Sequence, residues 1–159
     1  MRVLPADPGL LIVYCDGAAR GNPGPAGIGV VITREDGTLV DRIAEGIGVA
    51  TNYVAEYSAA IAGLARAAEL GASEILLRSD SRLLVEQLSG RFRVRNPTLQ
   101  RLHKEARALL GRFRRTRIEH VPREFNKDAD RAANEGVDAW LAGEGADYSP
   151  PEPAPRLWE

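Results

Sequence analysis

The sequence contains very little cysteine or histidine, which limits the cross-links and metal sites that it can form. There is one cysteine, Cys15, and there are two histidines in 159 residues. A single cysteine excludes an internal disulfide, and this suits the reducing environment of the cytoplasm. The histidines and the cysteine form no cluster with the spacing of zinc ligands. We therefore expect a cytoplasmic protein without a zinc centre.

Long apolar runs are also missing. The run from Leu10 to Tyr14 is far shorter than the roughly 20 residues that a membrane-spanning helix needs. No signal peptide or membrane anchor is visible, so we expect no membrane partner. Hydrophobic residues make up 44% of the chain and charged residues 27%, which is typical of a soluble globular protein. The length fits one compact domain.

The chain has almost no net charge, but its charges are unevenly spread. Ten of the 21 lysines and arginines lie between residues 91 and 117, together with a single acidic residue, Glu105. A basic segment in an otherwise acidic chain is a candidate surface for binding a phosphate backbone. A charge run alone is more simply interpreted as a solvated helix face.

The hydrophobic pattern predicts an α/β protein. Glycine and proline dominate residues 17–25, which we interpret as a loop. Three strands joined by short turns, followed by alternating helices and strands, indicate a mixed five-stranded sheet: three antiparallel strands, then parallel strands, flanked by helices. The predicted strands cover residues 10–16, 26–34, 38–47, 74–79 and 116–121, and the predicted helices cover 52–70, 80–88, 97–113 and 127–141.

These elements suggest a domain from residue 10 to residue 142. Residues 1–9 would form an N-terminal extension. Residues 143–159 hold four prolines and little periodicity, so we expect a flexible tail there. A proline-rich tail could dock a partner, and the chain could also be a domain of a larger protein.

Four acidic residues stand where a predicted strand ends or a predicted helix begins. They are Asp16, Glu56, Asp80 and Asp130. In an α/β sheet, these positions surround the natural crevice for a ligand. Each acid also has a plainer interpretation: a turn residue for Asp16, a favourable helix-start acid for Glu56, an N-cap for Asp80 and a solvated helix acid for Asp130.

A cluster of these carboxylates would be unfavourable without cations, because like charges raise each other's pKa. A pair of Mg²⁺ ions would remove this conflict, since Mg²⁺ prefers carboxylates, water and phosphate oxygens. Two such ions can activate water and stabilise the leaving oxygen in phosphodiester hydrolysis. The spacing alone does not show that the four acids meet.

Four segments in order resemble motifs of the ribonuclease HI family, and the resemblance extends from about residue 10 to residue 141. The segments are 14–27 (YCDGAARGNPGPAG), 51–57 (TNYVAEY), 79–81 (SDS) and 126–134 (NKDADRAAN). The resemblance implies a ribonuclease H-like fold. It also implies that the family's four catalytic, metal-binding carboxylates are Asp16, Glu56, Asp80 and Asp130, which favours Asp130 over Asp128.

The activity that the resemblance implies is endonucleolytic hydrolysis of the RNA strand of an RNA–DNA hybrid. The cofactor would be two Mg²⁺ ions, with Mn²⁺ as a possible substitute, and the products would carry 5′-phosphate and 3′-hydroxyl ends. We expect a monomer. Recognition would rest on hybrid shape and the RNA 2′-hydroxyl rather than on base identity. The implied substrate contacts are Gly17, Ala18, Asn22, Thr51, Asn52 and Arg82, although Thr51 could simply cap its helix.

The sequence departs from the family pattern in three places, one of which is near Val49, where a basic residue of the DNA-phosphate pocket of some relatives is replaced. Many members carry a catalytic histidine in a longer loop before the last acid, whereas here the loop is short and contains Arg123. Arg123 could orient the leaving phosphate but could hardly shuttle protons, since it stays charged. We expect His120 to be structural and His103 to be a solvated helix residue. Between Gly90 and Pro97 there is no room for the protruding basic helix of some relatives.

Other functions remain open from the sequence. The same fold class includes integrases, resolvases and Argonaute slicers, so the fold alone does not fix the function. Cleavage of double-stranded RNA as well as hybrid is one variant. A module that binds hybrid without cutting it is another, and it would require a missing carboxylate.

Overall fold

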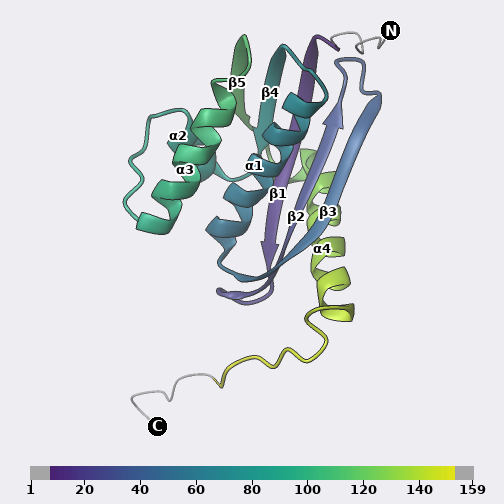
Figure 1. Ribbon diagram of the computed structural model, residues 1–159, viewed down its shortest axis with the longest axis vertical. Helices are drawn as coiled ribbons and strands as arrows, with labels where there is room; N and C mark the ends of the chain where they lie inside the picture. Colours follow the sequence, from purple (N-terminus) through teal and green to yellow (C-terminus); the bar gives the residue numbers. More distant parts are fainter. Residues whose placement is uncertain (1–7, 153–159) are drawn as a thin grey trace, which may run out of the picture.

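A computed structural model describes residues 8–152 and shows a five-stranded sheet with helices on both faces (Figure 1). The strand order is β3-β2-β1-β4-β5. The pairs β1–β2 and β2–β3 are antiparallel, whereas β1–β4 and β4–β5 are parallel, which confirms the predicted mixed sheet. The strands are β1 (Leu10–Ala19), β2 (Gly24–Thr33), β3 (Leu39–Ala50), β4 (Glu74–Ser79) and β5 (Arg115–His120).

Four α-helices and one 3₁₀ turn complete the described part of the chain. In Figure 1, α1, α2 and α3 lie in front of the sheet and α4 lies behind it. The core fills the space between the sheet and the front helices, with Leu11, Val13 and Leu64 fully buried there. The helical elements are α1 (Asn52–Glu69), α2 (Arg82–Leu88), α3 (Pro97–Leu110), η1 (Arg123–Phe125) and α4 (Lys127–Ala142).

Glycines of β2 allow α4 to lie directly on the strand backbone. A Cβ atom added to Gly29 would lie 3.0 Å from the carbonyl carbon of Ala129 and closer still to its oxygen. One added to Gly27 would lie 2.8 Å from the amide nitrogen of Val137. Because real Cβ atoms do not approach backbone so closely, glycine is required here, and it brings the first turns of α4 against the central strands.

The structure corrects the predicted loop at residues 17–25. β1 continues to Ala19 and β2 begins at Gly24, and Gly17 pairs with Ile28 across the two strands. Glycine and proline normally weaken strands, which is why the pattern suggested a loop. Here Gly17 stays in the sheet because the backbone at the start of α1 packs directly against it.

Two helix boundaries also differ from the predictions. The helix expected at residue 80 begins at Arg82, because the Ser81 side chain accepts the amide hydrogen of Leu84 and caps the helix. The helix expected to reach residue 113 ends at Leu110 and is followed by Gly111, and Phe113 is buried beyond the helix end.

The predicted terminal segments are described only in part. Residues 1–7 and 153–159, including Pro153 and Pro155, lie outside the described residues. Within the predicted tail, the ring of Tyr148 lies 6.0 Å from the ring of Trp140 at the end of α4. Flexibility of the tail stays a prediction. In the described range, no helix has the length and apolar character to cross a membrane.

Candidate active site

The four acidic residues singled out from the sequence line one cleft of about 410 Å³. The cleft lies where β1 and β4 meet the starts of α1 and α4. Arg123 and four of the six predicted substrate contacts line it as well. The lining residues are Asp16, Gly17, Ala18, Ala19, Asn22, Asn52, Tyr53, Glu56, Asp80, Arg123 and Asp130.

Asp16 and Glu56 are brought together by the absence of a side chain at Gly17. Successive strand residues face opposite sides of the sheet, so Asp16 faces α4 and Gly17 faces α1. A Cβ atom on Gly17 would lie 2.6 Å from the carbonyl oxygen of Ala55 and closer to the amide nitrogen of Glu56. The first turns of α1 therefore rest on β1, and this places Glu56 beside Asp16.

Asp80 is held by residues from two neighbouring elements. It follows directly after β4, and the Nε2 atom of His120 lies 3.2 Å from the Asp80 backbone oxygen. The Ser79 hydroxyl accepts the amide hydrogen of Ser81 at 3.0 Å, which shapes the turn into α2. His120 is the last residue of β5, and its contact supports the structural role expected for it.

Asp130 is positioned through Asn126, a buried residue at the start of α4. The Asn126 Nδ2 atom donates to the backbone oxygen of Cys15 at 3.0 Å, next to Asp16. The Asn126 backbone oxygen accepts the amide hydrogen of Asp130 at 3.1 Å. One side chain therefore joins the strand that carries Asp16 to the helix that carries Asp130.

Burial and the charge of neighbouring acids raise the pKa of two carboxyl groups of this cleft, those of Asp16 and Glu56. Burial first, then the charge of Asp80 and a hydrogen bond with Asp130, raise the pKa of Asp16 to about 8. Burial also raises the pKa of Glu56, although a hydrogen bond with Ser81 opposes the shift. Burial and the charges of neighbouring acids disfavour the ionised forms of Asp16 and Glu56, and a bound cation would favour these forms again.

The acidic cleft suits a hard divalent cation. The Glu56 Oε2 atom is buried and has no hydrogen-bond partner among the described residues, so it is free to act as a ligand. All four acids offer oxygen atoms, which Mg²⁺ prefers. Within residues 8–152, however, no group of three or more acidic, histidine or cysteine side chains has the geometry of a preformed metal site. The four acids thus fit a divalent cation by the chemistry of their oxygen donors and not by a preformed coordination geometry.

The thiol of Cys15 lies beside these acids but faces the core. Its side chain is fully buried and its Sγ atom donates to the backbone oxygen of Arg78 at 3.6 Å. Burial, followed by the charges of Asp16 and Asp80, raises the pKa of this thiol far above its usual range. Cys15 therefore stays protonated and takes no part in the chemistry of the cleft.

Two predicted substrate contacts do not line the cleft. The Thr51 hydroxyl accepts the amide hydrogen of Val54 at 3.2 Å, so this side chain caps α1, which was the plainer alternative for it. Arg82 is exposed in the first turn of α2, outside the residues that line the cleft. The Asn22 side chain accepts the amide hydrogen of Asn52 at 3.1 Å, which joins two of the contacts that do line it.

The solvated position expected for His103 is wrong. Its Nε2 atom lies 3.0 Å from the backbone oxygen of Gln87, and its ring packs edge-on against Tyr57 with centroids 6.5 Å apart. Gln87 itself is buried and accepts a hydrogen bond from the Tyr57 hydroxyl at 2.6 Å. His103 therefore belongs to a polar network that joins α3 to α2 and α1.

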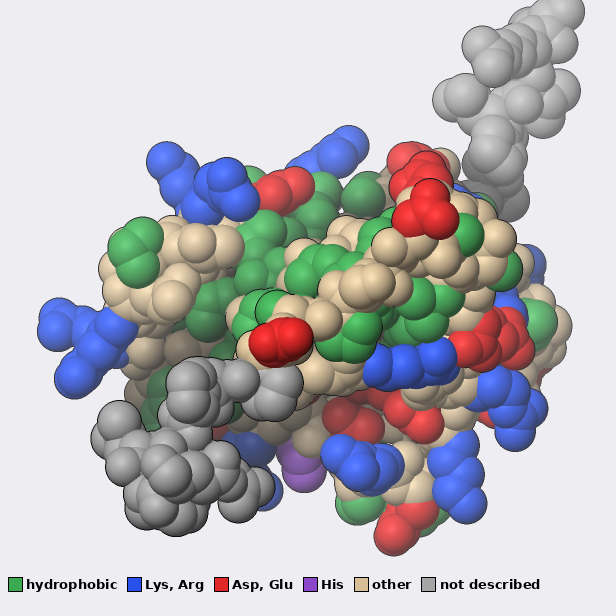
Figure 2. Space-filling model, turned by 90° about the horizontal axis from the view of Figure 1, so that it is seen from below, with side chains coloured by type: hydrophobic (Ala, Val, Ile, Leu, Met, Phe, Trp, Pro, Cys, Tyr) green, Lys and Arg blue, Asp and Glu red, His purple; other side chains and the backbone are tan. Residues whose placement is uncertain are grey.

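The basic segment covers the loop after α2, helix α3 and the start of β5. Figure 2 shows Lys and Arg side chains projecting on the side that carries α2 and α3, with few acidic side chains among them. Some of these arginines have local partners: Arg91 pairs with Glu86 at 2.6 Å, and Arg107 donates to the Leu88 backbone oxygen at 2.7 Å. These local partners fit the interpretation of a solvated helix face, and binding of a phosphate backbone by this segment stays a prediction.

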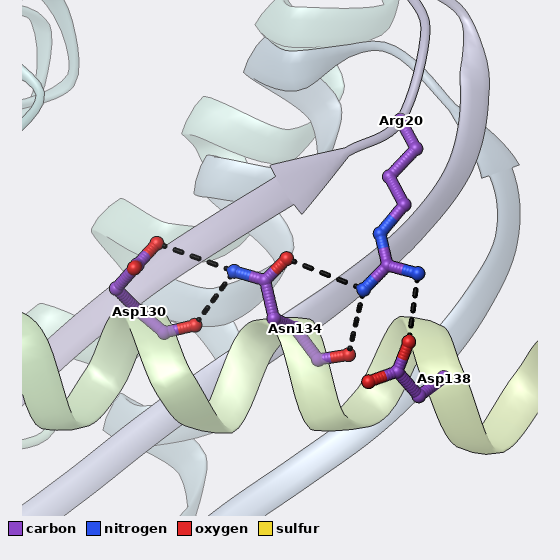
Figure 3. Close-up of polar contacts among 4 residues, drawn as sticks. All are labelled: Arg20, Asp130, Asn134 and Asp138. Carbon is purple, nitrogen blue, oxygen red and sulfur yellow. Dashed lines mark hydrogen bonds and ion pairs between the residues drawn. The ribbon is translucent and has the colours of Figure 1, made fainter.

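Some residues at the cleft were not assigned a role from the sequence. Ala19 and Tyr53 line it, and Tyr53 is an exposed aromatic residue beside Asn52, a signal that could have been recognised. Arg20 contacts Asn134 and Asp138 on α4 (Figure 3). Nothing in the sequence spacing indicated that Arg20 would reach this helix.

The fold and the acidic cleft together define a ribonuclease H-like domain. A family model described as reverse transcriptase-like matches residues 14–136. The ribonuclease HI of Halobacterium salinarum is 46% identical over 136 residues, which cover 86% of this chain and 68% of that protein. The chain belongs to the ribonuclease HI family of enzymes.

Solved structures agree with this assignment. The crystal structure of RNase H1 from Halobacterium salinarum matches with a TM-score of 0.81 over 82% of this chain and 99% of that chain, at 46% identity. LC11-RNase H1, isolated from compost, was solved in complex with an RNA/DNA hybrid and matches with a TM-score of 0.79 at 40% identity, over 82% of this chain and 99% of that one.

A bifunctional protein of Mycobacterium tuberculosis is 47% identical over 141 residues. These residues cover 88% of this chain and 39% of the mycobacterial protein. The chain therefore spans about two fifths of the length of that relative.

Proposed function

We propose that this protein is an endoribonuclease that hydrolyses the RNA strand of RNA–DNA hybrids. The observation that carries the proposal is the convergence of Asp16, Glu56, Asp80 and Asp130 on one cleft from four distant segments of the chain. The complex of the related LC11-RNase H1 with an RNA/DNA hybrid supports the choice of substrate. No carboxylate of the quartet is missing, which argues against a module that only binds hybrid.

The four carboxylates would hold the divalent cations. A pair of Mg²⁺ or Mn²⁺ ions would activate a water molecule and stabilise the leaving oxygen, which yields 5′-phosphate and 3′-hydroxyl ends. Glu56 would contribute its unpaired Oε2 atom. Asp16, whose raised pKa reflects burial, the charge of Asp80 and a hydrogen bond with Asp130, would give up its proton on binding a cation.

The rim of the cleft would bind the substrate by its shape. The backbone at Gly17 and Ala18 lies on the cleft surface. Because the side chains there are absent or small, a nucleic acid could approach this backbone closely. Asn22 and Asn52 lie side by side on the same rim, and their amide groups would contact minor-groove edges and sugars. Contacts of this kind read the 2′-hydroxyl and groove shape rather than base sequence.

Arg123 would act on the phosphate. It begins the 3₁₀ turn η1 between β5 and α4 and lines the cleft together with the acids. A guanidinium group offers paired N–H donors in a fixed plane, so Arg123 would orient the scissile or leaving phosphate by paired hydrogen bonds and would not transfer protons.

A cleavage assay with matched substrates tests the proposal. Hybrid, double-stranded RNA and duplex DNA of one sequence are incubated with Mg²⁺ or Mn²⁺, and with EDTA as the metal-free control. We expect cleavage of the RNA strand of the hybrid only with metal, and end analysis should find 5′-phosphates. Cleavage of double-stranded RNA at a similar rate would broaden the activity, and cleavage of DNA alone would contradict the proposal.

Variants of the carboxylates provide the second test. Asp16→Asn and Asp80→Asn should abolish cleavage while the circular dichroism spectrum stays unchanged, because a neutral amide is a poor metal ligand. Asp128→Asn is the matched control, since Asp128 lies on the same helix as Asp130 but does not line the acidic cleft. A near-normal rate for Asp16→Asn would remove this residue from the mechanism.

We also expect the protein to act as a monomer in the cytoplasm. Light scattering of the purified protein, with and without hybrid, measures the oligomeric state directly. Fractionation of the source cells measures the location.

A further inference from the structure

Three polar residues follow one another along the exposed face of α4, each four residues after the last. They are Asp130, Asn134 and Asp138, and Figure 3 shows them as one row. The Asn134 Nδ2 atom donates to the Asp130 backbone oxygen at 3.0 Å and lies 3.4 Å from the Asp130 Oδ1 atom. The only member of this row that lines the cleft, Asp130, therefore has an amide group beside its carboxylate.

Arg20 reaches this row from the turn between β1 and β2. Its Nη1 atom forms an ion pair with Asp138 at 2.7 Å. Its Nη2 atom donates to both oxygens of Asn134, the backbone oxygen at 3.3 Å and Oδ1 at 3.4 Å. Because Arg20 binds the amide oxygen of Asn134, the amide nitrogen must face Asp130, as Figure 3 shows.

The same turn also contacts the other helix that supplies a carboxylate. Asn22, two residues after Arg20, accepts the amide hydrogen of Asn52 at the start of α1. Glu56 lies one turn further along α1. The turn therefore joins the two helices that carry Glu56 and Asp130, one on each side of the sheet.

We propose that Arg20 is a positioning residue that acts through Asn134 to hold the Asp130 carboxylate ready for a divalent cation, with Asp138 as its anchor. This inference rests on the proposed function. Groups that hydrogen-bond a metal ligand fix its direction, and their loss typically weakens metal binding by about 10- to 100-fold. Arg20 and Asp138 are partly exposed, with side-chain exposures of 42% and 67%, so we expect a smaller effect here.

The geometry requires arginine at this position. The two terminal nitrogens of the guanidinium group contact two different residues at once, Asp138 through Nη1 and Asn134 through Nη2. A lysine ammonium group is a single point charge on a flexible stem and cannot hold both partners in a fixed direction. A conservative change to lysine should therefore fail to restore the position of Asp130.

A different role for Arg20 would be direct binding of a substrate phosphate from the rim of the cleft. The two roles predict opposite effects of Asp138. If Arg20 positions Asp130, then removing the negative charge of Asp138 releases the anchor and weakens metal binding. If Arg20 binds phosphate, then the same change frees the guanidinium group and improves binding of the hybrid.

The experiment compares Arg20→Met, Arg20→Lys and Asp138→Asn with the wild type. Arg42→Met is the matched control, because Arg42 forms a similar ion pair from β3 to α4, with Glu135 at 2.7 Å, but does not reach Asn134. Calorimetric titration with Mn²⁺ in the absence of nucleic acid measures cation affinity. Cleavage of hybrid measures kcat and KM separately.

For Arg20→Met we expect the Mn²⁺ dissociation constant to rise about three- to tenfold and kcat to fall by a similar factor, with KM changed by less than about twofold. Arg20→Lys should resemble Arg20→Met, and Asp138→Asn should shift both quantities in the same direction to a smaller extent. Arg42→Met should leave them unchanged.

Several results would overturn the inference. They are unchanged Mn²⁺ affinity in Arg20→Met, full recovery in Arg20→Lys, an equal loss in Arg42→Met, or tighter hybrid binding by Asp138→Asn. The slope of log KM against the logarithm of the salt concentration measures the number of phosphate contacts. If this slope is smaller by about one in Arg20→Met than in the wild type, then Arg20 binds a phosphate instead. A wild-type protein that binds Mn²⁺ but does not cut hybrid would refute the proposed function alone, because the Mn²⁺ titrations still decide the role of Arg20.

Discussion

Replacement of Gly17 by alanine tests how closely α1 must approach β1 for activity. An added Cβ atom would lie 2.6 Å from the Ala55 backbone oxygen and closer to the amide nitrogen of Glu56, whereas ordinary contacts begin at 3.4 Å. All of these neighbours are backbone atoms, so no side chain can rotate away. The start of α1 must therefore move by about 1 Å, and Glu56 must move with it.

Two consequences follow from this displacement. Overpacking of this kind costs about 1–3 kcal/mol of unfolding free energy, which urea denaturation of the metal-free protein would measure. A catalytic group displaced by about 1 Å can cost about 100-fold in rate. We therefore expect kcat for hybrid cleavage to fall by about two orders of magnitude and Mn²⁺ affinity to fall as Glu56 leaves the other acids.

Gly111→Ala is the matched control for this prediction. A Cβ atom there would meet only the Ala108 and Arg107 backbone oxygens, at 3.5 and 3.7 Å, and the backbone of Gly111 is already in the right-handed helical region. This change should leave activity intact and the stability unchanged or raised by about 0.4–1 kcal/mol. Wild-type kcat and Mn²⁺ affinity in Gly17→Ala would refute the argument that Gly17 sets the position of Glu56.

Three further predictions concern the same site and its support. The pKa of Asp16 is about 8 in the folded protein, against an ordinary value of 3.8 for an unfolded chain. Protonated Asp16 therefore stabilises the fold fully below pH 3.8, and this contribution is lost as the pH rises to about 8. Urea denaturation in EDTA should therefore show falling stability from about pH 4 to about pH 8, and Asp16→Asn should flatten this dependence. Arg123→Ala should lower kcat about tenfold with a smaller rise in KM, and Arg123→Lys should recover little, in steady-state kinetics on hybrid; a change in KM alone would contradict its role. Gly29→Ala should lower the unfolding free energy by about 3 kcal/mol, because the backbone of Ala129 occupies the space, and a normal urea midpoint would contradict the packing of α4.

The order and type of the elements could be predicted from the sequence because most strands and helices carry regular hydrophobic patterns. β4 and β5 agree with their predicted ranges within one residue, and α1 and α4 do so as well. The segment from Gly17 to Pro25 could not be predicted correctly, since Gly17 is required by a contact with the start of α1, which lies far away in the sequence. A local pattern contains no information about such contacts, so a strand rich in glycine resembles a loop.

The candidate site was predictable only with the family resemblance. Each of the four acids has an ordinary local explanation, and their convergence depends on sheet topology that spacing does not reveal. The row Asp130, Asn134, Asp138 shows a four-residue spacing that places all three on one helix face. The partner of this row, Arg20, is more than a hundred residues away in the chain and could be found only in the structure.

The shielded state of Cys15 has a practical consequence for experiments on this protein. Thiol reagents attack the thiolate, and Cys15 is both inaccessible and held protonated, so maleimide dyes should not modify the folded protein. A cysteine introduced at an exposed position such as Ala108 on α3 would then be the single labelling site without removal of the native one. A fluorophore there would test whether hybrid binds on the basic side of the molecule, while the acidic cleft keeps its native composition.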